Sequence, residues 1–428
     1  MDLAIYTLKS LAYIVVQPSL ILMLVIVSIL FYYKNKKLVG IQKLVIGCES
    51  RSALEITLAQ IAFGMLFGIL VSLVLMMLGI TFNENSGIEY LFLLSILMTF
   101  IRPRFVCFSY SGAVLGLIGL IVKLLNGQFG FNIKFFDIDI LCLMTFVGVM
   151  HILEGFLVII DGEKGSIPVF SNKDNKIVGG YAFSRYWLVP IAIFIAVSSM
   201  QNQGATVDLN TPAFWPILKT KYILNIIATC MLSVLPFFGV IGFSTVTFTK
   251  TKQKKIKSTG AYIIGFGIIL SLIAQICRIG VVGEVITVIL APLLHEFMLR
   301  IQNVKEDKNK PLFYSEEHSI CVLEVIPYSE FYAKGIVPGD RIIKLNGEYV
   351  QSEKELYNSF RSGLSVIELE VLKIDGEHKI ISIDLSNKDR VKILFVPIAV
   401  KKEEVVSVGG TKFSDVLDEA KQDNQIND

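Results

Sequence analysis

The chain has 428 residues, of which 53% are hydrophobic and only 18% are charged, and its formal net charge is +3. An ordinary soluble domain has about 25% charged residues, so this composition excludes a wholly water-facing protein. No long basic face is present, and no nucleic-acid partner is expected. Apolar blocks fill residues 1–300, whereas residues 301–428 have the composition of a soluble protein, which predicts two regions with a boundary near Arg300.

The apolar blocks predict a polytopic bundle of eight or nine transmembrane helices, because about 20 apolar residues cross a bilayer. The first block is expected to be retained, since its charged cluster follows it and no small-residue cleavage motif appears. The third and sixth are short enough to be re-entrant, and only Arg278-Ile279-Gly280 separates the last two. The predicted helices are 11–33, 58–81, 88–101, 105–124, 139–160, 186–200, 221–248, 261–277 and 280–299.

The basic clusters between these blocks predict the orientation, because cytoplasmic loops are enriched in Lys and Arg. Clusters follow the first block, the third, the fifth and the seventh. With nine spans they place the N-terminus outside and the C-terminal region in the cytoplasm, and the lipid bilayer is the first expected partner. The clusters are Lys34/Lys36/Lys37, Arg102/Arg104, Lys173/Lys176/Arg185 and Lys250/Lys252/Lys254/Lys255/Lys257.

Ionisable groups inside spans indicate function by default, because burying charge in lipid is costly. His151 and Glu154 lie three apart in one predicted helix and Glu284 lies in the last, so a transporter is one hypothesis and a helix–helix hydrogen bond the plainer one. Glycine pairs at Gly64/Gly68 and Gly112/Gly116 have the spacing of close helix packing, which leaves a homo-oligomer open.

The loop Asp161–Arg185 is long for a connector and contains turn residues and strand-like pieces. Loops of this length often carry function, but a simple connection explains it equally well.

No enzyme motif is recognised in the chain. A zinc protease of the membrane needs His-Glu-x-x-His, and the sequence from His295-Glu296 to Leu299 lacks the second histidine. The six cysteines are scattered singly, which favours small apolar residues over a zinc site or a disulfide framework. No catalytic residue, metal or cofactor is therefore expected.

Residues 319–386 alternate strand-like runs with turn residues. Strands are predicted at Ile320–Val325, 366–374 and 379–385, and a helix at Glu353–Arg361. The Asn346-Gly347 pair is typical of a hairpin turn, because both turn positions need positive φ.

This order resembles the PDZ fold of bacterial proteins, through the Gly335-Ile336-x-Pro338-Gly339-Asp340-x-Ile342 run and the Leu345-Asn346-Gly347 hairpin. The resemblance implies an α+β domain that captures a peptide at a strand edge. The strand at Ile320–Val325 would receive the peptide and the helix would form the opposite wall. Glu316 and Glu317 would repel a terminal carboxylate, which favours internal segments. The implied peptide-binding residues are Ser319, Ile320, Cys321, Val322, Leu323, Leu356 and Phe360.

The predicted domains are 1–300 (membrane bundle), 301–318 (linker), 319–398 (PDZ-like, with an added strand near 391–397) and 399–428 (charged mobile tail). The whole layout, with His151-Ile152-Leu153-Glu154-Gly155 before the Gly179-Gly180 loop and a C-terminal PDZ, resembles the MinJ family of polytopic membrane proteins. That resemblance implies a non-enzymatic scaffold in cell division, enriched at septum and poles, with DivIVA and MinD-type proteins as partners. The alternatives are a transporter with a regulatory PDZ domain and a PDZ regulator of a separate protease.

Overall fold

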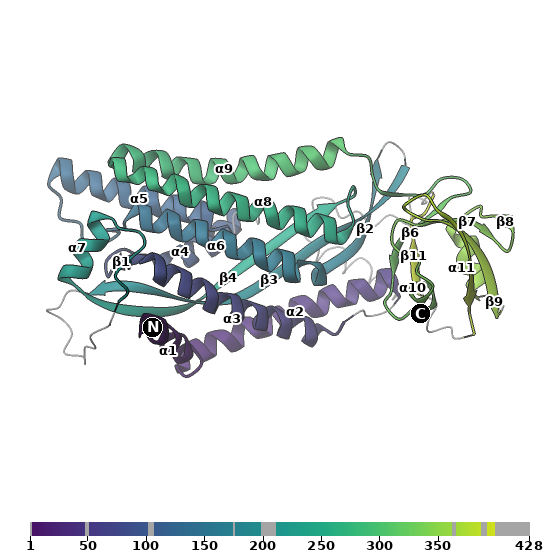
Figure 1. Cartoon of the computed structure of the whole chain (residues 1–428), viewed down its shortest axis with the longest axis horizontal. Helices are drawn as coiled ribbons and strands as arrows, with labels where there is room; N and C mark the ends of the chain where they lie inside the picture. Colours follow the sequence, from purple (N-terminus) through teal and green to yellow (C-terminus); the bar gives the residue numbers. More distant parts are fainter. Residues whose placement is uncertain are drawn as a thin grey trace. The chain divides into compact units, whose positions relative to one another are not determined.

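The structure is a computed structural model that describes residues 2–47, 51–101, 107–173, 176–197, 211–361, 365–386 and 392–398 (Figure 1). The chain divides into two compact units. The helical unit comprises Met1–Pro168 and Tyr181–Lys310, and the sheet unit comprises Val169–Gly180 and Pro311–Asp428. The charged tail predicted at 399–428 and the basic pair Arg102/Arg104 lie outside the described residues.

Six helices among the described residues are long and apolar enough to cross a membrane, so the protein is a multi-pass membrane protein by length and composition. Shorter helices are α1 (Asp2–Ile14), α4 (Tyr90–Ile101) and α7 (Lys221–Thr229). The six are α2 (Pro18–Ile46), α3 (Ala53–Leu78), α5 (Phe108–Phe129), α6 (Ile140–Asp161), α8 (Lys252–Ile273) and α9 (Val281–Lys308).

Local sequence explains where these helices begin and end. The Ser52 side chain accepts a hydrogen bond from the Glu55 N–H, and Asp139 accepts one from the Cys142 N–H, so each caps the first turn of its helix. Pro18 begins α2 and separates it from α1, which divides the predicted helix 11–33. The segment Ala274–Ile279 and Gly280 (φ 110°) form the turn between α8 and α9.

Helix α6 is the centre of the helical unit, because most of its residues are buried. It packs antiparallel to α8 through two glycine pairs. A Cβ atom on Gly148 would lie 2.8 Å from the Gly267 carbonyl oxygen, and one on Gly155 would lie 2.7 Å from that of Gly260. The two backbones therefore approach more closely than larger side chains would allow.

Two of the predicted helices, 186–200 and 221–248, are wrong in the described residues, because most of these residues form long strands. Strand β3 (Lys176–Val197) pairs antiparallel with β4 (Met231–Thr247) over an unbroken register from Tyr181↔Thr247 to Val197↔Met231 (Figure 1). Both runs are continuously apolar, and periodicity does not separate a buried strand from a buried helix in such a run.

The helices cover this hairpin and supply partners to its backbone. Gly68 of α3 lies against Pro190, and the Ala192 N–H donates to the Ser72 hydroxyl at 2.9 Å. Leu188 and Phe238 share a buried cluster with Phe31 of α2. Non-helical backbone at membrane depth is tolerated where protein buries it, and most of β3 is buried in this way. Strand β4 is less covered, since Leu235 and Val246 are exposed.

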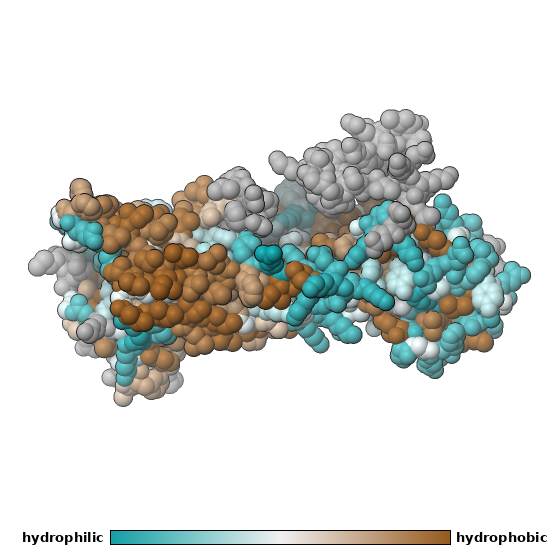
Figure 2. All heavy atoms as spheres, turned by 90° about the horizontal axis from the view of Figure 1, so that it is seen from above, coloured by the Kyte–Doolittle hydropathy of each residue, from teal (hydrophilic) through white to brown (hydrophobic). Residues whose placement is uncertain are grey.

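Hydrophobic side chains also cover the outside of the helical unit. Figure 2 shows them gathered on the face that includes α9. Exposed apolar residues of this kind would be unfavourable in water but suit a lipid-facing surface. On α8 and α9 they include Ile268, Ile269, Leu272, Ile289, Leu293 and Phe297.

The sheet unit has its own core, and its strand order is β10-β9-β7-β6-β11, with β8 paired to β7. The helix at Glu353–Arg361 and the strand at Ile320–Val325 are confirmed at their predicted bounds, as α11 and β6. Asn346 and Gly347 have positive φ at the turn between β7 and β8, as predicted. The other elements are β5 (Phe313–Tyr314), α10 (Glu330–Ala333), β7 (Arg341–Leu345), β8 (Glu348–Tyr349), β9 (Val366–Leu372), β10 (His378–Asp384) and β11 (Ile393–Phe395).

Strands β1 (Thr81–Asn83) and β5 each pair with β3 as well. The first is parallel, with Thr81 opposite Phe194, and the second is antiparallel, with Tyr314 opposite Val178. Strand β2 (Ser166–Lys173) follows η2 (Gly162–Gly165), so the predicted Asp161–Arg185 loop contains a strand and the start of β3.

Candidate functional site

Strand β6 has no open edge in the structure. All six of its residues are buried. On one side it pairs with β7 at Ile320 and Cys321, and on the other it pairs antiparallel with β11, from Ile393↔Val325 to Phe395↔Val322. The chain's own β11 therefore takes the place that the sequence prediction assigns to a bound peptide.

Strand β11 is one of the two edge strands of this sheet, and β10 is the other. Lys392 accepts a hydrogen bond from the Ile326 N–H and Val396 donates one to the Cys321 carbonyl, so these two residues turn their main-chain groups toward β6. Main-chain groups alternate in direction along an antiparallel strand, so those of Ile393 and Phe395 face outward.

These outward groups meet one side chain from α11. The Tyr357 hydroxyl lies 3.3 Å from the Ile393 carbonyl oxygen and 3.2 Å from the Phe395 nitrogen. Burial raises the pKa of Tyr357, so the hydroxyl keeps its proton, donates to Ile393 and accepts from Phe395. A single phenol thus occupies the edge of the sheet where another strand would pair.

The residues predicted to line the far wall of the groove instead form the core. Leu356 is fully buried, and the Phe360 ring packs 5.3 Å from that of Phe331 and 6.2 Å from that of Phe395. The functional candidate that the sequence reasoning missed is Tyr357, whose polar tip on the apolar side of α11 was the available signal.

The turn before β6 also differs from an open carboxylate site. Glu316 and Ser319 exchange both main-chain hydrogen bonds at 3.0 Å, so these N–H groups are already used. The Glu316 carboxylate lies 3.5 Å from Lys176 and 3.8 Å from Arg341. Cations therefore compensate the acidic approach that the sequence analysis expected to repel a carboxylate.

A second group of candidate functional side chains, with one thiol and two imidazoles, lies in the helical unit. Cys107 precedes α5, His151 lies midway along α6 and His295 lies midway along α9. The Cys107 Sγ is 2.9 Å from the His151 Nε2 and 3.3 Å from the His295 Nε2. Sequence separations of 44 and 188 residues hide this cluster from any local motif.

The other ionisable residues singled out in the sequence have separate positions. Glu284 pairs with Lys123 at 2.7 Å, so it bridges α9 and α5. Glu154 is half-buried on α6, one turn beyond His151. The glycines Gly64, Gly68, Gly112 and Gly116 all pack against residues of this same chain, so the helix-packing signal is used inside the molecule.

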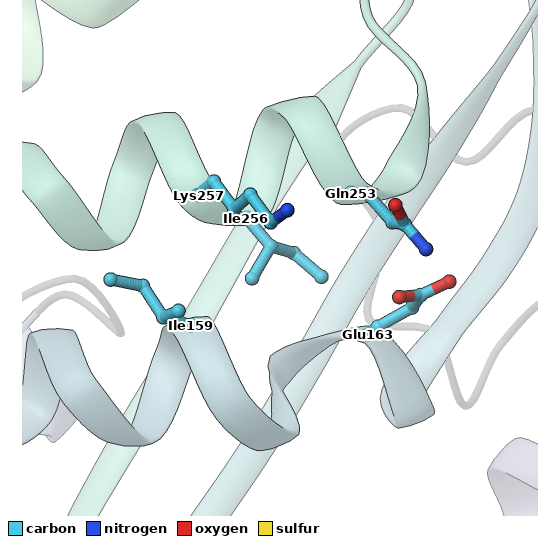
Figure 3. Close-up of a pocket in the computed structure, with 5 residues that line it drawn as sticks. All are labelled: Ile159, Glu163, Gln253, Ile256 and Lys257. Atoms are coloured by element: carbon cyan, nitrogen blue, oxygen red, sulfur yellow. The ribbon is translucent and has the colours of Figure 1, made fainter.

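A shallow pocket opens between the end of α6 and the start of α8, and Figure 3 shows Glu163 and Gln253 facing each other across it. It contains none of the site residues predicted from the sequence. Its lining residues are Ile159, Glu163, Gln253, Ile256 and Lys257.

The chain was compared with known proteins at three levels. Protein-family models, curated proteins and solved structures give no match to it.

Proposed function

We propose that the protein is a membrane-anchored, non-enzymatic adaptor whose sheet unit captures an extended segment of another protein. The observation that carries the proposal is the edge of β11, where two outward main-chain groups are held by the Tyr357 hydroxyl instead of by a strand. A guest strand would replace two hydrogen bonds to one phenol with a main-chain ladder, the usual source of affinity in strand addition.

The membrane anchor can make a weak contact between the β11 edge and a guest strand sufficient for binding. Confining the binding unit to a bilayer raises its effective concentration for partners in the same membrane. The distribution of Lys and Arg supports a cytoplasmic sheet unit. The resemblance to polytopic PDZ proteins of the MinJ family supports cell-division proteins of the DivIVA and MinD type as those partners.

The Tyr357→Phe variant tests the edge directly. Removing the hydroxyl takes away the Tyr357 hydrogen bonds to the Ile393 carbonyl and the Phe395 N–H. A guest strand then no longer has to displace the hydroxyl to pair with these main-chain groups. Site-specific photocrosslinking from position 394 in living cells should give a several-fold higher yield of partner adducts in this variant. Tyr328→Phe is the matched control, because Tyr328 is 92% exposed.

Equal adduct yields in the wild type and the Tyr357→Phe variant would overturn the proposed docking edge. The cellular part of the proposal has its own test, which is fluorescence microscopy of the tagged full-length chain. Enrichment at septa and poles supports a role in division, and uniform membrane signal contradicts it.

A further inference from the structure

We propose that Cys107, His151 and His295 bind one divalent transition-metal ion of the zinc class inside the helical unit. The three residues come from three separate elements, and their ligand atoms all lie within 4.8 Å of one another. This site is independent of the adaptor function, since every residue in it belongs to the helical unit.

The spacing of the ligand atoms suits a single ion. With a Zn–S bond of about 2.3 Å and a Zn–N bond of about 2.0 Å, tetrahedral geometry separates sulfur from nitrogen by about 3.5 Å. The two observed separations, 2.9 and 3.3 Å, lie within several tenths of an ångström of that value. The two imidazole nitrogens lie within 4.8 Å of each other, and they would have to come within about 3.3 Å to share one tetrahedral ion, so binding requires the side chains to rotate.

The protons on the two imidazoles can be assigned from their other contacts. The His151 Nδ1 lies 2.7 Å from the Val147 carbonyl oxygen, which only accepts, so Nδ1 carries the proton. Tyr110 donates to the Glu296 carboxylate at 2.6 Å, and its oxygen then accepts from the His295 Nδ1 at 3.3 Å. In each neutral ring the Nε2 is left with a lone pair.

The lone pairs of both Nε2 atoms face the Cys107 sulfur, and the thiol has too few protons to donate a hydrogen bond to each of them. A neutral thiol has one proton to share between two acceptors, and the Ser109 N–H already donates to the same sulfur at 3.4 Å. A metal cation satisfies both nitrogens and a thiolate at once. The tautomers are also those that metal ligands adopt when a carbonyl or hydroxyl holds the outer nitrogen.

The surroundings restrict the kind of ion. The Phe266 ring packs 4.8 Å from the His151 ring and 5.3 Å from the His295 ring, which makes one wall apolar. Imidazole and thiolate ligands together favour zinc-class ions over magnesium or calcium, which prefer oxygen. The Cys107 thiolate would offset part of the charge of a divalent ion.

Three ligands among the described residues leave one tetrahedral position for water or another small ligand. Structural zinc sites are closed by four protein ligands, whereas sites with three keep an open position. The geometry is therefore that of an open site, and exchange of the fourth ligand is expected.

The test uses the full-length chain, purified in detergent and loaded with zinc, with metal content measured by mass spectrometry. We expect about one zinc ion per chain after removal of excess metal. Replacing zinc by cobalt should give the strong visible bands of a tetrahedral ion and a thiolate-to-cobalt charge-transfer band. Cys107→Ser should abolish that band and lower metal affinity at least tenfold.

Matched variants separate the site from general effects on folding. Cys142→Ser alters a fully buried thiol of α6 outside the cluster, and His318→Gln alters a histidine of the sheet unit, so both should keep the metal. Tyr110→Phe removes the hydroxyl that accepts from the His295 Nδ1 and donates to Glu296, and it leaves all three metal ligands in place. Loss of the outer hydrogen bond to His295 should weaken binding about tenfold.

The wild-type measurements decide the question even where a variant fails to fold. Far less than one ion per chain after zinc loading, or a cobalt spectrum without a thiolate band, would overturn the site. So would unchanged binding by Cys107→Ser or equal loss of metal from Cys142→Ser.

Discussion

At the residue scale, a buried ion pair lies beside the β3–β4 hairpin, and burying its two charges has a high desolvation cost. Arg185 and Asp161 are both fully buried and form a salt bridge, and the Trp187 indole N–H donates to the same carboxylate at 2.9 Å. Lys164 lies 2.9 Å from the other carboxylate oxygen. These contacts tie the start of the hairpin to the end of α6.

The Arg185→Met variant should lower the free energy of unfolding by about 3 kcal/mol, because it removes the buried cation from Asp161 and leaves the carboxylate with Lys164 and the Trp187 N–H. Thermal unfolding in detergent, followed by the intrinsic fluorescence of Trp187 and Trp215, measures this change. Arg51→Met is the control, since the Arg51–Glu55 pair is exposed and such pairs contribute about 0–1 kcal/mol. Similar losses in the two variants would refute the special role of the buried pair.

Cys321 should be unreactive in the folded protein at pH 8. Burial raises the pKa of this thiol to about 11, and the thiolate is the form that attacks an alkylating reagent. The thiol therefore stays protonated at pH 8, and its alkylation rate should rise only as pH approaches the raised pKa or as the sheet unit unfolds. Mass spectrometry of single-cysteine variants measures this, with the partly exposed Cys230 as the reactive reference. Equal rates at Cys321 and Cys230 would contradict the burial.

At the element scale, the crossing of α6 and α8 depends on the absence of side chains at four glycines. A Cβ atom on Gly267 would meet the Ile152 nitrogen at 2.8 Å, so Gly267→Ala must push the helices apart. Overpacking of this kind costs about 1–3 kcal/mol. We expect a lower melting temperature in detergent.

The same helix offers a matched control for that substitution. A Cβ atom on Gly265 would have nothing within 4 Å, so Gly265→Ala should be neutral or raise stability by up to about 1 kcal/mol through helix propensity. Equal destabilisation by both variants would show that the close crossing is not what the glycines provide.

Elements were predictable where their pattern was local. Strands β6, β9 and β10 and helix α11 of the sheet unit followed from alternation and turn dipeptides. Apolar length identified the long helices, but it predicted eight or nine spans, and six helices among the described residues are long and apolar enough to span. The β3–β4 hairpin did not, because a continuous apolar run of the right length carries the same signal for a buried strand and for a membrane helix. The pairing of β3 with β4 over 17 residues depends on tertiary structure, and the sequence of neither strand predicts it alone.

The two candidate sites could not be predicted from the sequence for a related reason. Their geometry depends on contacts between distant segments: β11 lies beside β6 only after the intervening sheet has formed, and Cys107 meets His295 across 188 residues. Single-residue chemistry was visible in the sequence, but its assembly required the fold.

At the scale of the whole molecule, the two units have separate cores. The buried cluster of the sheet unit contains only residues between Ile320 and Phe395, and the helical unit buries its own clusters around α6 and the hairpin. A unit with a separate core is expected to tolerate loss of the other.

Deleting residues 319–398 should therefore leave the remaining chain in the membrane while abolishing partner capture. The six candidate spans and the metal-binding residues all lie before residue 319, so membrane flotation and zinc content should stay at wild-type levels. Co-purification from crosslinked cells should lose the partners that the intact chain retains, because the β11 edge is gone. Partners retained after the deletion would assign recruitment to the helical unit, whereas loss of the protein from the membrane would show that the two units do not fold separately.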